Sequence, residues 1–123
     1  MNNRPLVSVI DDDESVRESL PDLLRELGFA VRAFASAEAF LASTELSQTR
    51  CLILDVAMPG MSGPDLQREL SLRGRDVPIV FITAHRDELV RPRVLQDGAV
   101  ACLFKPFSDT ALLQALRAAL HIV

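Results

Sequence analysis

Cysteine is scarce in this chain, and long apolar runs are absent. Cys51 and Cys102 are the only cysteines among 123 residues. Two cysteines are too few for a disulfide scaffold and fit no metal-binding spacing, so a reducing cytoplasm is the expected compartment. No apolar run approaches the ~20 residues that a membrane span needs, and the first residues, MNNRPLV, lack the apolar core of a signal peptide. We therefore expect no association with a membrane.

An excess of positive charge is also absent. The chain has 13 Lys and Arg against 17 Asp and Glu, a formal net charge of −4, which argues against direct binding to nucleic acid. Lys105 is the only lysine. Because the sequence contains no internal repeat, low-complexity segment or linker, residues 1–123 are expected to form one domain, with no separate output domain among them.

Short apolar runs predict the strands of a parallel sheet. Four runs are nearly continuous, which is typical of strands covered on both faces. They are LVSVI (6–10), CLILD (51–55), PIVFI (78–82) and VACLF (100–104). A weaker run at residues 30–35 is interrupted by Arg32, which favours an edge strand.

Helical patterns separate these runs. The first predicted helix has its apolar face on residues from Val16 to Leu27. The others span residues 36 to about 44, about 63–72, a short segment beginning near Arg91 or Pro92, and a last segment that Ser108 caps. Gly28 closes the first helix, and Pro21 is expected to kink it. Five strands alternating with five helices predict a doubly wound α/β fold.

Polar residues follow the predicted strands where ligands bind in open α/β sheets, beyond the carboxyl ends. Asp11 and Asp12 follow the first strand, Asp55 closes the third, Thr83 follows the fourth, and Lys105 follows the fifth. Each of these residues alone has a structural explanation, as a helix cap, a turn residue or a surface charge. Independent caps and turns give no reason for three acids, a hydroxyl and the single lysine to share one edge of a sheet.

This combination suits phosphoryl transfer. Three clustered carboxylates tolerate one another around a hard divalent cation such as Mg²⁺. Asp55 closes an apolar strand, so its carboxylate is held rigidly and can act as a nucleophile that forms an aspartyl phosphate. The Lys105 ammonium and the Thr83 hydroxyl can bind phosphoryl oxygens.

Four motifs resemble the response-regulator receiver domain of bacterial two-component systems. They are VIDDDESVRESL, LILDVAMPGMSG, VFITAH and LFKPF, in this order and spacing, and the resemblance covers essentially the whole chain. The segments SAEAFL, DVAMPGMSG and GAV look closest to the FixJ-type branch. The resemblance implies a flavodoxin-like (βα)5 fold, whose five-stranded parallel sheet has the order 2-1-3-4-5.

The resemblance also implies a function. Asp55 would accept a phosphoryl group from a sensor histidine kinase or a phosphotransfer protein. Mg²⁺ would be bound by Asp12, Asp55 and the backbone carbonyl of Ala57, with Asp11 acting mostly through water. Thr83 and Lys105 would engage the phosphoryl group, and Lys105–Pro106 would be a cis peptide. The surface of the fourth helix, fifth strand and fifth helix would then change and regulate a partner or a DNA-binding output domain. A homodimer could form through the same surface.

The chain departs from the family at one switch position. Receivers usually have Tyr, Phe or His three residues before the lysine, an aromatic that swings inward when the switch hydroxyl engages the phosphoryl group. This chain has Cys102 there, which predicts a weaker local switch. His85, two residues past Thr83, would either line the path of the attacking water or be an ordinary loop histidine.

Two other functions remain as alternatives. A pseudo-receiver would signal through protein contacts alone, and the intact set of acids, Thr83 and Lys105 argues against it. A haloacid-dehalogenase-type phosphatase would be a true enzyme, but its signature needs a second Asp two residues after the nucleophile, where this chain has Ala57. We therefore expect a signalling receiver rather than an enzyme.

Overall fold

The computed structural model describes residues 4–84 and 89–121, in which strands and helices alternate along the chain. The elements are β1 (Leu6–Ile10), α1 (Glu14–Glu26), β2 (Ala30–Phe34), α2 (Ala37–Leu41), the 3-10 helix η1 (Thr44–Ser47), β3 (Cys51–Asp55), α3 (Gly63–Leu72), β4 (Ile79–Thr83), α4 (Val90–Gln96), β5 (Ala101–Phe104) and α5 (Asp109–Leu120). Among these helices, none has the length and hydropathy that crossing a membrane requires.

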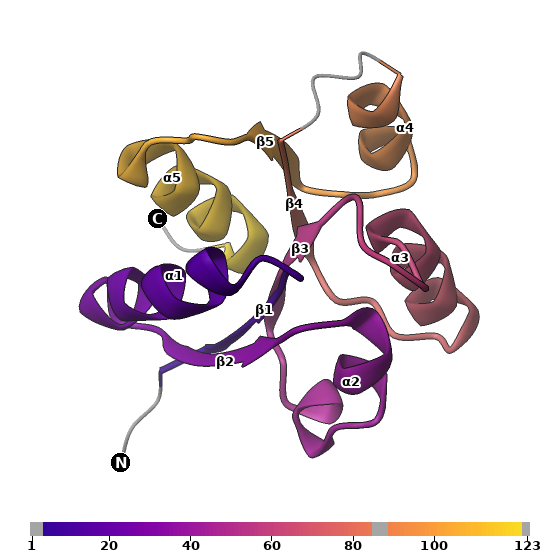
Figure 1. Ribbon diagram of the computed structural model, residues 1–123, viewed down its shortest axis with the longest axis horizontal. Coiled ribbons are helices and arrows are strands. Elements are labelled where there is room, and N and C mark those ends of the chain that lie inside the picture. Colours follow the sequence, from indigo (N-terminus) through magenta and orange to yellow (C-terminus); the bar gives the residue numbers. More distant parts are fainter. Residues whose placement is uncertain (1–3, 85–88, 122–123) are drawn as a thin grey trace.

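All five strands form one parallel sheet in the order β2-β1-β3-β4-β5. This confirms the doubly wound fold and the order 2-1-3-4-5. Helices α1 and α5 cover one face of the sheet, and α2, α3 and α4 cover the other (Figure 1). Each face has its own buried apolar cluster, because parallel strands must be covered on both sides.

Burial along the strands explains their sequences. Every residue of β3 and β4 is buried, as continuous apolar runs require. Strand β2 pairs only with β1 and carries the exposed Arg32, so the edge-strand prediction is confirmed.

Helix starts follow the capping side chains. The Asp13 carboxylate accepts a hydrogen bond from the Ser15 N–H at the start of α1 (2.9 Å), so one of the clustered acids serves as a helix cap. Ser62 and Asp65 form a reciprocal capping box at α3, and Ser108 caps α5. Both caps agree with the sequence prediction.

Two helix boundaries differ from their predictions. Helix α2 ends at Leu41 rather than near Thr44. Both the backbone N–H and the hydroxyl of Ser43 donate to the Phe40 carbonyl (3.0 and 2.7 Å), which turns the chain out of the helix. Helix α4 is short, as expected, but starts at Val90, so Pro92 is its third residue, where no intrahelical donor is needed. Helix α1 continues through Pro21, and the kink expected there stays a prediction.

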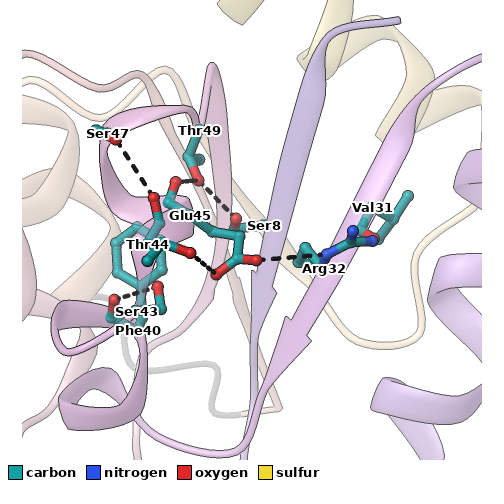
Figure 2. Close-up of polar contacts among 9 residues, drawn as sticks. All are labelled: Ser8, Val31, Arg32, Phe40, Ser43, Thr44, Glu45, Ser47 and Thr49. Carbon is teal, nitrogen blue, oxygen red and sulfur yellow. Dashed lines mark hydrogen bonds and ion pairs between the residues drawn. The ribbon is translucent and has the colours of Figure 1, made fainter.

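A buried hydroxyl pair attaches η1 to the sheet (Figure 2). The Ser8 hydroxyl on β1 lies 2.7 Å from the Thr49 hydroxyl, which donates to the Glu45 carbonyl at 2.7 Å. Since Thr49 uses its own proton on Glu45, the Ser8 hydroxyl is the donor to Thr49. The Glu45 carboxylate also pairs with Arg32 of β2 at 3.6 Å, so η1 is bound to two neighbouring strands.

Replacing Thr49 is expected to cost more stability than replacing Ser8. Thr49→Val leaves the fully buried Ser8 hydroxyl without its acceptor, a loss of roughly 1 to 3 kcal/mol, whereas Ser8→Ala leaves Thr49 bonded to Glu45 and costs roughly 1 kcal/mol or less. Urea denaturation of both variants measures the difference. Equal losses would contradict the assigned donor direction.

Candidate functional site

The candidate site lies at the carboxyl edge of the sheet, and backbone hydrogen bonds fix each member. The Asp11 N–H donates to the Phe34 carbonyl of β2 (3.1 Å). Asp55 is the last residue of β3 and pairs in register with Ile82. Thr83 ends β4, and its carbonyl accepts the Lys105 N–H at 2.8 Å. The sheet thus brings together the four polar positions predicted from the sequence.

Three carboxylates converge there. One carboxylate oxygen from each of Asp11, Asp12 and Asp55 lies within 4.8 Å of the others. Asp11 is fully buried and Asp55 is 7% exposed, whereas Asp12 is exposed. Oxygen ligands of this number and charge fit Mg²⁺. Ala57, whose carbonyl the resemblance adds to the ligand set, is exposed two residues after Asp55, and its role as a ligand stays a prediction.

The Lys105 ammonium lies between two of these carboxylates. Its Nζ donates to Asp11 Oδ2 at 2.8 Å and lies 3.8 Å from Asp55 Oδ1. The other Asp11 oxygen accepts the Asp13 N–H at 2.9 Å. Burial alone would lower the pKa of Lys105, but the hydrogen bond to Asp11 and the charges of Asp55, Asp11 and Asp13 outweigh it and raise the pKa above its ordinary value. Lys105 therefore stays positively charged in this site, and Asp11 is its closest partner.

Asp55 is left with too little compensating charge. Burial and the neighbouring Asp11 charge raise its pKa from 3.8 to about 7, against the opposing effect of Lys105. Asp55 is 3.8 Å from Lys105, whereas Asp11 forms the close pair. A divalent cation would favour the ionised form of Asp55.

Metal-free protein is expected to lose stability as the pH rises towards neutrality. The pKa of Asp55 is higher in the folded protein than in the unfolded chain, so its contribution is complete below about pH 4 and is lost as the pH rises through about 7. Asp55→Asn should remove this slope and raise the unfolding free energy at pH 7.5 by roughly 1 to 3 kcal/mol. Urea denaturation in a chelator at pH 5 and 7.5 measures both. Parallel pH profiles for the two proteins would contradict the raised pKa.

The backbone around Asp55 is closely packed. The Gly63 N–H donates to the Val56 carbonyl at 3.0 Å. A Cβ atom at Gly63 would collide with the Asp55 carbonyl oxygen and lie 2.9 Å from the Phe81 ring. The start of α3 therefore touches the end of β3. The backbone of Asp55 is held by its pairing with β4 and by the contact with Gly63.

Both residues predicted to form a switch are buried, and Cys102 packs against α4. Thr83 is 1% exposed, and Cys102 is 2% exposed in the same apolar cluster as Val94 of α4. Burial raises the pKa of the Cys102 thiol, and the charge of Arg91 opposes this. The Arg91 guanidinium lies over the Phe104 ring, 5.7 Å from its centre. His85 lies outside the described residues.

Several contacts of the site were not predicted from the sequence. An Arg17 guanidinium nitrogen donates to the Asp11 carbonyl at 3.0 Å. The Gln67 amide of α3 donates to the Val94 carbonyl of α4 at 3.2 Å. The Arg91–Phe104 contact joins α4 to β5. Each contact joins residues on different elements or turns, and no motif signals them.

The Lys105–Pro106 peptide bond is cis, as the resemblance implies.

Comparison with known proteins agrees with this site. Residues 7–117 match the family described as the response regulator receiver domain. The chain belongs to this family. Its relatives are response regulators of two-component signalling, which are signalling proteins. Receiver domains generally bind Mg²⁺ at an acidic pocket and are phosphorylated by histidine kinases, and this structure has a cluster of three acids, Asp11, Asp12 and Asp55.

Individual relatives support the FixJ-type resemblance. The chain is 44% identical over 117 residues to the response regulator protein TodT of Pseudomonas putida, covering 95% of this chain and 52% of TodT. It is 41% identical over 118 residues to the transcriptional regulatory protein FixJ of Rhizobium meliloti, covering 95% and 58%. The crystal structure of FixJ-N has a TM-score of 0.87 and 37% identity, covering 98% of this chain and 97% of that one. The chain spans about half the length of the curated relatives it matches.

Mg²⁺ is expected to stabilise the protein by binding the folded state, by about 1.4 kcal/mol at ten times the dissociation constant. Asp12→Ala should abolish most of this effect and leave the metal-free fold as stable or more stable, because Asp12 is exposed and adds to the carboxylate repulsion. Melting curves with and without Mg²⁺ test this. Asp22→Ala, which removes one charge from an exposed position of α1, is the control. An unchanged Mg²⁺ response in Asp12→Ala would contradict the assignment.

Proposed function

We propose that this domain is a phosphorylation-dependent switch that accepts a phosphoryl group on Asp55 from a histidine kinase or a phosphotransfer protein. One observation carries the proposal: the Asp55 carboxylate lies at the same edge of the sheet as two other acids and 3.8 Å from the partly buried Lys105 ammonium. Structural acids need no such arrangement. A nucleophile that must receive a dianionic group needs both the cation and the oxygen ligands.

In this reaction an ionised Asp55 oxygen attacks the phosphorus of a phosphohistidine. The new P–O bond forms as the P–N bond breaks, and the bond electrons leave with the imidazole. Asp12, Asp55 and the Ala57 carbonyl would hold Mg²⁺, with Asp11 acting mostly through water, and the ion would supply positive charge for the phosphoryl oxygens. Lys105 turns from Asp11 towards one of these oxygens, and the Thr83 hydroxyl donates to another. The packed Gly63 backbone keeps Asp55 aligned for the attack.

The output of the switch is a change in the surface of α4, β5 and α5. Phe104 supports this proposal, because it precedes Lys105, pairs in register with Thr83 and contacts Arg91 of α4. A movement of Thr83 and Lys105 therefore reaches α4 through one ring. The same surface is the proposed interface with a partner, an output domain or a second copy of the domain.

Phosphorylation is tested directly. Incubation with Mg²⁺ and a small phosphodonor should add one acid-stable, hydroxylamine-labile phosphate, and mass spectrometry should find it on Asp55 and find none in Asp55→Asn. No addition to the wild-type protein would favour the pseudo-receiver. Rapid turnover of external phosphoesters would favour the phosphatase.

Cys102→Tyr is expected to make the two states of the switch more distinct. The Cys102 side chain has one rotatable bond and little volume, whereas a ring would be either packed beneath α4 or turned out to solvent. Amide-exchange protection across residues 89–104, with and without beryllofluoride, measures the response, and Cys102→Ala is the control. A full two-state response in the wild-type protein that Cys102→Tyr does not enlarge would contradict the weakened switch.

A further inference from the structure

The loop between Asp55 and α3 is held by a side chain from another helix. This loop, residues 56–62, contains Ala57 and turns at Gly60, whose φ is +76°. The Glu38 carboxylate of α2 accepts a hydrogen bond from the Met61 N–H at 3.1 Å. The two residues are 23 positions apart in the chain. The contact thus ties the loop that follows the phosphoacceptor to an element outside the site.

Helix α2 is a firm base for this contact. Its residues Ala37 and Phe40 are fully buried, and the Phe40 ring meets the Phe34 ring edge to face at 5.4 Å. Ser36 caps the helix by accepting the Ala39 N–H. Glu38 therefore projects from an anchored turn. Met58 of the loop is 9% exposed in the same apolar cluster, so the loop is held at Met58 by burial and at Met61 by hydrogen bonding.

Gly60 allows the carboxylate to come this close. A Cβ atom built on Gly60 would lie 2.6 Å from a Glu38 carboxylate oxygen. The positive φ of Gly60 also favours glycine there. The turn and the carboxylate are thus fitted to one another.

We propose that Glu38 is a positioning residue for phosphoryl transfer: it fixes the loop at Met61 so that the Ala57 carbonyl and Asp55 face the same metal ion. The inference rests on the proposed function, because it assigns Glu38 a role in that site. It gives the SAEAFL segment, whose third residue is Glu38, a role beyond forming a helix. Glu38 itself touches neither the metal nor the phosphoryl group.

Two substitutions separate hydrogen bonding from charge. Glu38→Ala removes the acceptor, and should weaken Mg²⁺ binding and slow phosphorylation by a small phosphodonor by roughly three- to tenfold each. Glu38→Gln keeps an acceptor oxygen without the charge, and should stay within about twofold of the wild-type protein. Glu45→Gln is the matched control, because Glu45 is an acid on the neighbouring η1 whose carboxylate pairs with Arg32 instead.

A readout independent of phosphorylation is the amide exchange of Met61 in metal-free protein. Exchange should accelerate in Glu38→Ala and remain slow in Glu38→Gln and Glu45→Gln. Unchanged Met61 exchange in Glu38→Ala would overturn the contact, and faster exchange with unaltered Mg²⁺ affinity would overturn the positioning role. Equal losses of Mg²⁺ affinity in the Ala and Gln variants would show an effect of charge and also overturn it. If the wild-type protein takes no phosphate, the proposed function fails, while Mg²⁺ affinity and Met61 exchange still decide this inference.

Discussion

The pairing of the Lys105 ammonium with the fully buried Asp11 carboxylate is the interaction on which the site depends. Burying a carboxylate without a partner costs several kcal/mol, by rough estimate, and Lys105 supplies that partner at 2.8 Å. The same ammonium is farther from Asp55, at 3.8 Å, so it stabilises the two carboxylates unequally. Asp11 is satisfied, whereas the pKa of Asp55 rises to about 7. In the proposed function, a cation from solution would supply the remaining positive charge at Asp55.

The strand order brings the two acids together, but it does not decide which of them Lys105 pairs with, because β3 lies nearer to β5 than β1 does. Strands β1 and β3 are neighbours in the middle of the sheet, so Asp11 and Asp55 must emerge side by side. Strand β5 lies at the edge, beyond β4, and Lys105 has to reach across Thr83 to meet either acid. A single long side chain that arrives from that side serves one acid fully and the other partly. The parallel topology therefore produces the repulsion, and the pairing of Lys105 with Asp11 leaves it only partly relieved.

Most of the fold, and the gathering of Asp11, Asp55 and Lys105 at one edge of the sheet, could be predicted from the sequence. The predictions for β3, for β4 and for the helix caps are confirmed. Each of them depends on a few neighbouring residues: a continuous apolar run for the strands, and Ser62 and Ser108 for the caps. The predicted end of α2 was wrong, because the hydrogen bonds from Ser43 to the Phe40 carbonyl end the helix earlier. Contacts between distant segments, such as Glu38 with Met61, leave no periodic signal and need the folded chain.

The two sides of the site are built differently, and this difference suits a switch. The loop after Asp55 is held by Glu38, by the burial of Met58 and by the Gly63 backbone, all of which resist movement. Helix α4 has seven residues, of which Val94 alone is buried. Its polar ties to neighbouring elements include the Gln67 amide bond and the Arg91–Phe104 contact, each worth about 1 kcal/mol. In the proposed switch, a new hydrogen bond at Thr83 or Lys105 would be of the same strength as these contacts, so it could move α4 while the Asp55 carboxylate stays in place.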